Sequence, residues 1–239
     1  MSRERASAMG GRTLVTLAET PRLNAWICSK LAPGVRGDVL EIGSGIGNLS
    51  RHIRPMAARL VVTDTEPHYL EALRALFAGD TAVGVAAYEL DQPPPAVLKA
   101  RGFDTIVAIN VIEHIADDRT LVARLARLLR PGGNLLVYVP ACPIAFGSLD
   151  VALGHHRRYT PEALTSLLAA GPLEPERPRY VNLLGLGGWL VAGRLLRRTS
   201  LPPSGVALFE RLMPLVRLED KIALPFGLGL FARATKSAG

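Results

Sequence analysis

Short apolar runs alternate with longer amphipathic stretches along most of the chain. Five of the runs have the length of strands and are bounded by turn residues, which is typical of strands buried inside a sheet. They cover residues 39–42, 60–63, 81–88, 103–109 and 135–139. Because stretches of a different periodicity separate most of them, the pattern predicts strands and helices in alternation.

The stretches between these runs have the apolar spacing of helices. In the longest of them, Asp117 or Asp118 can cap the helix, and Pro131-Gly132-Gly133 ends it. Thr160 followed by Pro161 is the same kind of start signal for a later helix. Including that one, further helices are expected over residues 22–31, 48–57, 67–78 and 161–170.

Alternating strands and helices imply an α/β fold with a doubly wound, mostly parallel sheet, which we expect to have seven strands. The last two strands are placed near residues 174–181 and 228–235. Residues 183–225, apolar and dotted with arginine, are expected to form an α-helical cap inserted near the C-terminus. Residues 1–36 are expected to be an N-terminal helical segment, and residues 1–239 a single domain.

A glycine-rich turn follows the first predicted strand. Gly43, Gly45 and Gly47 stand at every second position, with Ser44 among them and Glu41 two residues before the first glycine. Glycine lets the backbone turn sharply and lets a ligand lie against the main chain. The amides of a following helix favour a carboxylate or phosphate. The turn therefore predicts a site for a nucleoside-like ligand.

This G-x-G-x-G turn, with its preceding acid, resembles motif I of the class I S-adenosylmethionine (SAM) methyltransferases. Four further stretches fit the same family in the same order, at residues 61–64, 103–114, 129–133 and 154–160. The last of them resembles a segment of a small-molecule and glycan-associated branch. The resemblance covers about residues 20–180. It implies a Rossmann-like fold, SAM as cofactor and S-adenosylhomocysteine (SAH) as product.

The resemblance also assigns cofactor contacts. Asp64, with Thr65 beside it, ends the second strand, where a carboxylate would bind the ribose hydroxyls; the alternative is a helix N-cap. Asp91 would contact the adenine amino group or simply form a turn. The backbone carbonyl of Asn110 would bind the SAM ammonium, while Glu41 and the glycine turn would lie against the methionine and ribose portion.

Histidines and an acid near the expected sulfonium are candidates for a general base. Glu113-His114 resembles a pair found in many family members, and His114 is expected either in catalysis or in packing at a helix start. His155 or His156 lies on the loop after the fifth strand, which faces the substrate in such folds. Histidine suits the task because its unperturbed pKa is about 6.5.

Arg157, Arg158 and Tyr159 follow these histidines. They are expected to bind an anionic or hydroxylated acceptor, since arginine makes bidentate contacts; the alternative is a basic surface loop with Tyr159 anchored in the core. The acceptor is expected to be a specialised metabolite, a sugar or a lipid-linked intermediate, methylated on oxygen or nitrogen. No metal is expected, because no recurring Cys/His ligand set is present.

Two other functions fit the same residues. One is a SAM fold repurposed for cyclisation or decarboxylation, and the other is a non-catalytic, membrane-associated binding protein. The net charge of +7 indicates either an arginine-rich background or attraction to an anionic partner. A nucleic-acid methyltransferase is a further option that only this charge supports. No RNA-binding signature or aromatic stacking platform accompanies the charge, and DNA is not an expected partner.

Residues 181–193 are apolar but only about half as long as the ~20 residues of a membrane span. They are expected to belong to the cap, with a peripheral membrane contact or a dimer face as alternatives. The chain is therefore expected to act as a monomer or homodimer. Two cysteines make no disulfide framework, and no apolar signal segment opens the chain, so a cytoplasmic location is expected.

Overall fold

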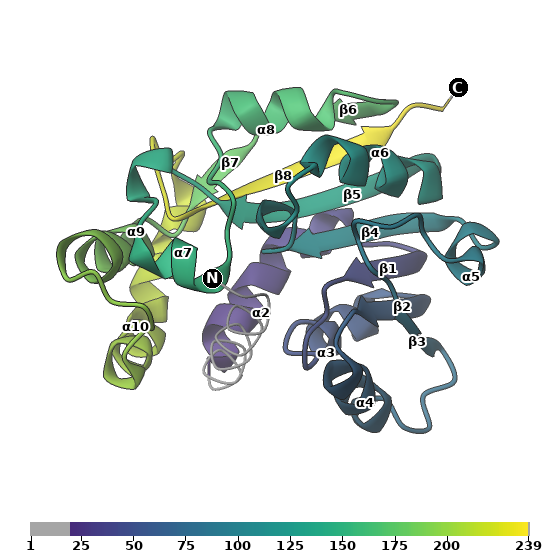
Figure 1. The fold of residues 1–239 in the computed structure, drawn as a ribbon, viewed down its shortest axis with the longest axis horizontal. Helices are drawn as coiled ribbons and strands as arrows, with labels where there is room; N and C mark the ends of the chain where they lie inside the picture. The colour runs from purple at the N-terminus through teal and green to yellow at the C-terminus, as the bar shows by residue number, and fades with distance from the viewer. Residues whose placement is uncertain (1–19, 239) are drawn as a thin grey trace.

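The computed structural model describes residues 20–238, which form one sheet with helices on both faces (Figure 1). The strands are β1 Asp38–Ile42, β2 Arg59–Asp64, β3 Val83–Ala87, β4 Phe103–Ile109, β5 Leu129–Pro140, β6 Leu173–Pro175, β7 Arg179–Val181 and β8 Gly229–Lys236. Their order across the sheet is β3-β2-β1-β4-β5-β8-β6, with β7 also paired to β8. The first five are mutually parallel and β8 is antiparallel, so the predicted doubly wound, mostly parallel fold is confirmed.

The described residues also form α-helices, which flank the sheet (Figure 1). They are α2 Pro21–Leu31, α3 Ser50–Ile53, α4 Pro67–Leu76, α5 Ala96–Lys99, α6 Asp118–Leu128, α7 Ser148–Leu153, α8 Pro161–Leu168, α9 Leu183–Trp189 and α10 Pro203–Val216, with a π-helical segment over Leu190–Leu195. Shorter 3₁₀ turns cover Ala32–Gly34, Arg54–Met56, Ile112–His114, Pro143–Ala145 and Arg217–Lys221. Two predicted N-caps are confirmed, because the Asp117 side chain accepts from the Thr120 amide and the Thr160 side chain from the Ala163 amide.

Alternate side chains of the buried strands serve two separate cores. On one face, Leu40 and Ile42 pack in the cluster that contains the apolar residues of α6 and α8. On the other, Val39 packs with buried residues of α2, α3 and α4. A third cluster joins Trp26 of α2 to Met213 of α10. Helices thus cover both faces of the sheet, so a ligand would reach it at the carboxyl ends of the parallel strands.

The structure corrects the last strands. Instead of one strand near residues 174–181, the two short strands β6 and β7 both pair with β8. Three residues, 176–178, separate Pro175 from Arg179, while two residues separate their partners on β8, so the ladder bulges here. Pro178 has no N–H to donate and cannot close the gap. The sheet therefore has eight strands, and β6 and β7 lie one after the other along the same edge of β8.

Residues 183–225 contain α9, the π-helical segment and α10, which Figure 1 shows beyond the carboxyl ends of β4 and β5. Their function as a cap over the site stays a prediction. The predicted segment 1–36 contains α2, and its residues 1–19 lie outside the described part of the chain. Within residues 20–238, we find no helix with the length and apolar character that crossing a bilayer requires.

Candidate functional site

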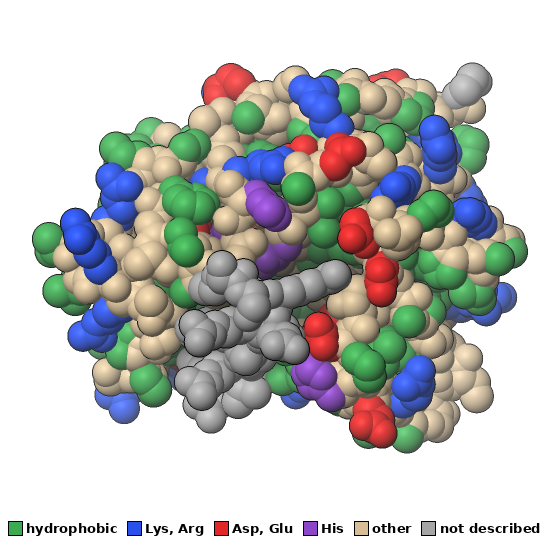
Figure 2. All heavy atoms as spheres, in the orientation of Figure 1, with side chains coloured by type: hydrophobic (Ala, Val, Ile, Leu, Met, Phe, Trp, Pro, Cys, Tyr) green, Lys and Arg blue, Asp and Glu red, His purple; other side chains and the backbone are tan. Residues whose placement is uncertain are grey.

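The sheet reverses its winding between β1 and β4, which are neighbours at its centre. At such a switch point the turns leaving the two strands run in opposite directions and leave a crevice, the usual ligand site in open α/β sheets. A cavity of about 1500 Å³ lies here. Figure 2 shows it as a hollow in the middle of one face, with histidine side chains on one side and acidic side chains on the other.

Most of the residues predicted for the site meet in this cavity. The cofactor candidates that line it are Gly43, Ser44, Gly45, Asp64, Thr65, Asp91 and Asn110, and the other candidates are His114, His155, His156 and Arg158. The remaining candidates, which are not part of the lining, are Glu41, Gly47, Glu113, Arg157 and Tyr159. Residues far apart in sequence thus converge on one volume, although their individual roles stay predictions.

The glycine turn has the backbone that its sequence predicts. Gly43, Gly45 and Gly47 have φ of 63°, 54° and 84°, in the left-handed region that favours glycine. A Cβ on Gly43 would lie 2.6 Å from Cγ2 of Val111, so β1 also needs glycine here to pass the turn after β4. The Gly45 amide donates to Oδ2 of Asp64 at 2.8 Å, which joins the turns after β1 and β2.

The carboxylate of Asp64 already organises its own turn. Its Oδ1 accepts from the amides of Thr65 at 2.7 Å and Glu66 at 3.2 Å. The N-cap position of α4 belongs to Glu66, so Asp64 is not the cap that was the alternative. A carboxylate offers about four acceptor sites, and three amides leave capacity for a further donor from the cavity.

Glu41 is buried beside the glycine turn, with only 4% of its surface exposed. Its Oε2 has no hydrogen-bond partner among the described residues. Burial raises the pKa of Glu41 to about 7, although the hydroxyls of Ser50 and Ser44 lower it in part. An acid held in this way gains most from a cationic neighbour.

The turn after β4 is fixed by an unusual backbone. Asn110 has φ of 51°, which asparagine tolerates better than most residues, and its amide donates to the Tyr138 carbonyl at 2.8 Å. Its side-chain type thus suits the backbone of the turn.

Asp91 follows β3 and is exposed at the cavity wall. This position is compatible with both predicted roles, a contact to the adenine and a simple turn.

His155 is oriented by an acid that the sequence did not single out. Its Nδ1 lies 2.9 Å from Oδ1 of Asp150, which is completely buried on α7. Asp150 also accepts from Nε of Arg158 at 2.8 Å and from the Trp189 indole at 3.1 Å. The carboxylate therefore holds the imidazole, the guanidinium and the helix α9 in one arrangement.

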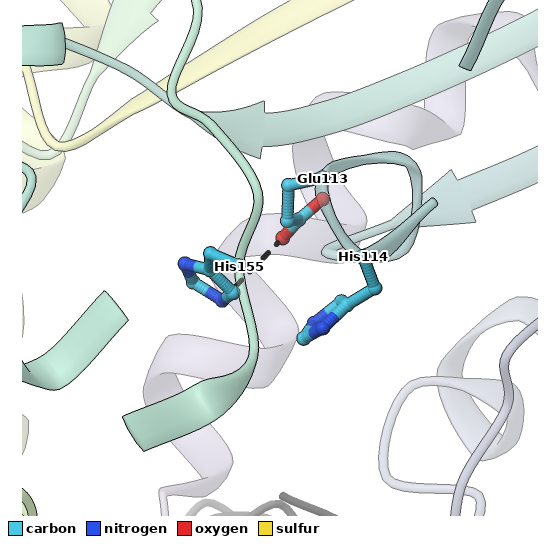
Figure 3. A group of neighbouring side chains, drawn as sticks. All are labelled: Glu113, His114 and His155. Atoms are coloured by element: carbon cyan, nitrogen blue, oxygen red, sulfur yellow. Dashed lines mark ion pairs between the residues drawn. The ribbon is translucent and has the colours of Figure 1, made fainter. Parts of the chain in front are cut away.

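Glu113 and His114 lie next to His155 (Figure 3). Burial raises the pKa of Glu113 to about 8. Desolvation, followed by the charge of His155, lowers the pKa of His114 to about 4, although its ring is reached from the cavity. The exposed His156 is tied to this group because its amide donates to the Glu113 carbonyl at 2.8 Å.

The predicted substrate residues have partners within the protein. The buried Arg158 donates to Asp150 and to the Ala141 carbonyl, and its guanidinium lies over the Trp189 ring at 4.8 Å. Arg157 pairs with Asp118 at 2.6 Å, and the hydroxyl of the buried Tyr159 donates to the same carboxylate at 2.8 Å. This geometry favours the alternative of a basic loop anchored by Tyr159, and a substrate role stays a prediction.

Tyr138 and Trp189 line the cavity, and Asp150 contacts its lining residues His155 and Arg158, but sequence reasoning singled out none of the three. A sequence signal existed for Asp150, because an acid three residues after an N-cap position is typical of a capping box. In the structure, the Asp150 side chain accepts a hydrogen bond from the amide of the N-cap residue Gly147. The other two had none, because their place depends on how β5 and α9 meet in space.

The fold and the site together define a class of protein: a doubly wound α/β domain with a glycine turn lining the crevice at the switch point of its sheet. A family model described as a methyltransferase domain matches residues 40–135. A ubiquinone biosynthesis O-methyltransferase of Xanthomonas axonopodis pv. citri is 28% identical over 139 residues, 57% of this chain and 57% of that protein. A "Probable S-adenosylmethionine-dependent methyltransferase" of Mycolicibacterium smegmatis is 33% identical over 177 residues, 70% of this chain and 65% of that protein.

The chain thus spans less than two thirds of the length of these curated relatives, at 57% and 65%. Among solved structures, the N-methyltransferase NodS of Bradyrhizobium japonicum, in complex with S-adenosyl-L-homocysteine, has the same fold. Its TM-score is 0.56 at 16% identity, and the match covers 90% of this chain and 85% of that one. The chain belongs to the class I S-adenosylmethionine-dependent methyltransferases.

Proposed function

We propose that the chain transfers a methyl group from SAM to an oxygen atom of a small, largely apolar acceptor, with nitrogen as the second choice. The observation that carries the proposal is that one cavity is lined both by the glycine turn with Asp64 and by three histidines. A cofactor and an acceptor would therefore meet in the same volume. The relative named as a ubiquinone biosynthesis O-methyltransferase favours oxygen and a small acceptor.

The residues present fit SAM. Bound there, SAM would supply a methyl group on a sulfonium that is already a good leaving group. Asp64 has acceptor capacity left for the ribose hydroxyls, and the buried, unpartnered oxygen of Glu41 suits the ligand ammonium. Asp91 is free at the wall for the adenine amino group. Because Gly43 has no Cβ, the backbone of the turn can approach the ligand closely.

His156 is the residue we assign as proton acceptor. During methyl transfer, a ring nitrogen of His156 would accept the proton of the acceptor hydroxyl. This side chain lines the cavity and is exposed, while its backbone is fixed by Glu113. Most of the rate would come from holding the oxygen about 3–3.5 Å from the methyl carbon.

The acceptor wall of the cavity is apolar. Besides the histidines, it is formed by side chains from α9 and α10, among them Leu184, Trp189, Leu208, Phe209 and Leu212. Such a wall suits an aromatic ring or an alkyl chain better than a free sugar. It agrees with the lipid-linked acceptor considered from the sequence.

Replacing Asp64 by alanine is expected to weaken SAH binding at least tenfold, because the ribose would lose its charged acceptor and the Gly45 amide its partner. Calorimetric titration of SAH into wild type and variant measures the effect. Asp80→Ala is the matched control, since Asp80 pairs with Arg54 outside the cavity. A folded wild type that binds no SAH would end the proposal, and binding without SAH production from any acceptor would favour cyclisation or decarboxylation instead.

We also propose that the outer face of α10 and the adjoining π-helical segment rests on an anionic lipid surface. Leu215 is 58% exposed on α10, four residues after the exposed Arg211 and therefore on the same helix face. Leu195 is 75% exposed at the end of the π-helical segment, before Arg197. Apolar side chains interspersed with arginine are typical of interfacial helices.

The acids of the same region are turned away from this face. Glu210 accepts from the amides of Arg22 and Leu23 at the start of α2. Glu219 accepts from the amides of Asn182 and Leu183. Arginine is thereby left as the dominant charge on the outside, as an anionic surface requires.

Vesicle co-flotation tests this contact. The protein is expected to float with vesicles containing phosphatidylglycerol and much less with pure phosphatidylcholine. Leu195→Glu with Leu215→Glu is expected to reduce binding at least tenfold, through lost apolar burial and added repulsion. Val97→Glu is the control, because Val97 is 57% exposed on α5. Equal binding by both variants, or none by wild type, would contradict the proposal while leaving the SAH result intact.

A further inference from the structure

The cavity wall beside the end of β4 brings together three side chains that can bind a metal. Glu113 and His114 come from the 3₁₀ turn Ile112–His114, and His155 comes from the segment after α7 (Figure 3). One donor atom from each lies within 4.8 Å of the others. No other group of three acidic, histidine or cysteine side chains this close occurs within residues 20–238.

Glu113 lacks a hydrogen-bond partner for its carboxyl oxygens. The residue is 0% exposed, and neither Oε1 nor Oε2 has a hydrogen bond to any described residue. Burying an unpaired acid is costly whether it is charged or neutral, and native proteins rarely leave such a group unsatisfied. The nearby guanidinium of Arg158 does not resolve this, because it is already bonded to Asp150 and Ala141.

The two histidines each have one ring nitrogen engaged. Nδ1 of His155 faces Asp150 at 2.9 Å, while its Nε2 lies 4.0 Å from Oε1 of Glu113. His114 is hydrogen-bonded to the backbone of Gly154. A histidine whose other nitrogen donates to a carboxylate or carbonyl is the usual second-shell arrangement of metal ligands, because it fixes the tautomer and aims the free nitrogen.

We propose that Glu113, His114 and His155 bind a divalent transition-metal ion, with its open positions toward the cavity. Two imidazoles and one carboxylate suit Zn²⁺, Fe²⁺, Co²⁺ or Mn²⁺ better than Mg²⁺ or Ca²⁺. Bonds of about 2.0–2.2 Å require the donors to draw together by roughly 1 Å, which rotation of the cavity-facing His114 ring can supply. This inference differs from the expectation, drawn from the sequence, that no metal is bound.

An open metal position would also explain what holds the acceptor. A hydroxyl oxygen bound to the ion becomes more acidic and keeps a fixed place in the cavity, beside His156. This second part of the inference rests on the proposed function, whereas metal binding itself does not. The two can therefore fail separately.

The test is metal binding by the intact chain. Protein stripped with EDTA is titrated with Zn²⁺ by calorimetry and with Co²⁺ by visible spectroscopy, and one ion per chain is expected. Glu113→Gln and His155→Ala are expected to weaken binding about 100-fold or more. Asp150→Asn is expected to weaken it about 10–100-fold through the loss of His155 orientation. His52→Ala, on α3 and outside the group, is the control.

SAH titration of the same metal-free samples separates the outcomes. A wild type that binds SAH but no Zn²⁺ would overturn the metal site and leave the proposed function standing. Zn²⁺ binding that is equally strong in wild type, Glu113→Gln and His155→Ala would also overturn it, since the ion would then lie elsewhere. Zn²⁺ binding lost in both variants, with or without SAH binding, supports the site.

Discussion

Gly45→Val is expected to abolish SAH binding, with Kd raised about 100-fold or more. Gly45 has φ of 54°, a conformation that a β-branched residue adopts only with strain. Its amide also donates to Asp64, so any shift of the turn removes the acid from its place. Calorimetric titration with SAH measures the loss, since the same backbone is proposed to lie against the ligand.

The matched control for this substitution is Gly79→Val. Gly79 also has a left-handed φ, of 85°, but a Cβ there would meet no atom within 4 Å. The control should lower Tm through the same backbone strain and leave Kd for SAH unchanged. If Gly45→Val bound SAH as wild type does, the glycine turn would not be part of the cofactor site.

Arg158→Ala is expected to lower the free energy of unfolding by about 3–5 kcal/mol, the usual effect of removing one partner of a buried ion pair. The Arg158 side chain is 1% exposed and that of Asp150 is 0% exposed. The variant would leave the Asp150 carboxylate without its cation and Trp189 without the guanidinium over its ring. Urea unfolding followed by far-UV circular dichroism measures the change.

Arg157→Ala provides the comparison. Its ion pair with Asp118 is partly exposed, at 33% and 15%, and such pairs contribute only about 0–1 kcal/mol. A small loss for Arg157 and a large one for Arg158 would fit the internal roles seen in the structure. If Arg158→Ala left stability unchanged and raised KM for the acceptor, the substrate-binding role predicted from the sequence would be right instead.

The sequence was sufficient where structure is decided locally. The first strand was predicted at residues 39–42 and is observed at Asp38–Ile42, because an apolar run followed by a glycine turn permits little else. Asp117 and Thr160 were recognisable as caps for the same reason: the side chain and the amide that it accepts are three residues apart. The glycine turn and Asp64 could be predicted for a similar reason, because each lies in a single connection between one strand and the next helix.

The sequence was insufficient where distant segments decide. Asp150 lies on α7, a helix that the apolar pattern did not indicate, and its role depends on Arg158, His155 and Trp189 converging on it. The closeness of Glu113 and His155 could not be read from the sequence for the same reason, since the two residues are far apart in the chain and meet only through the loop geometry. The sequence alone could not place Arg158, because a buried, internally paired arginine and a ligand-binding arginine look the same in a sequence.

The position of β8 has a consequence for how the chain is made. This strand follows all its partners in sequence, yet it lies between β5 on one side and β6 and β7 on the other. While a ribosome is still synthesising residues 183–228, β5 presents an unpaired edge, and the two short strands have nothing to pair with. Exposed edges recruit other chains, so this interval is when the nascent protein most needs shielding by chaperones.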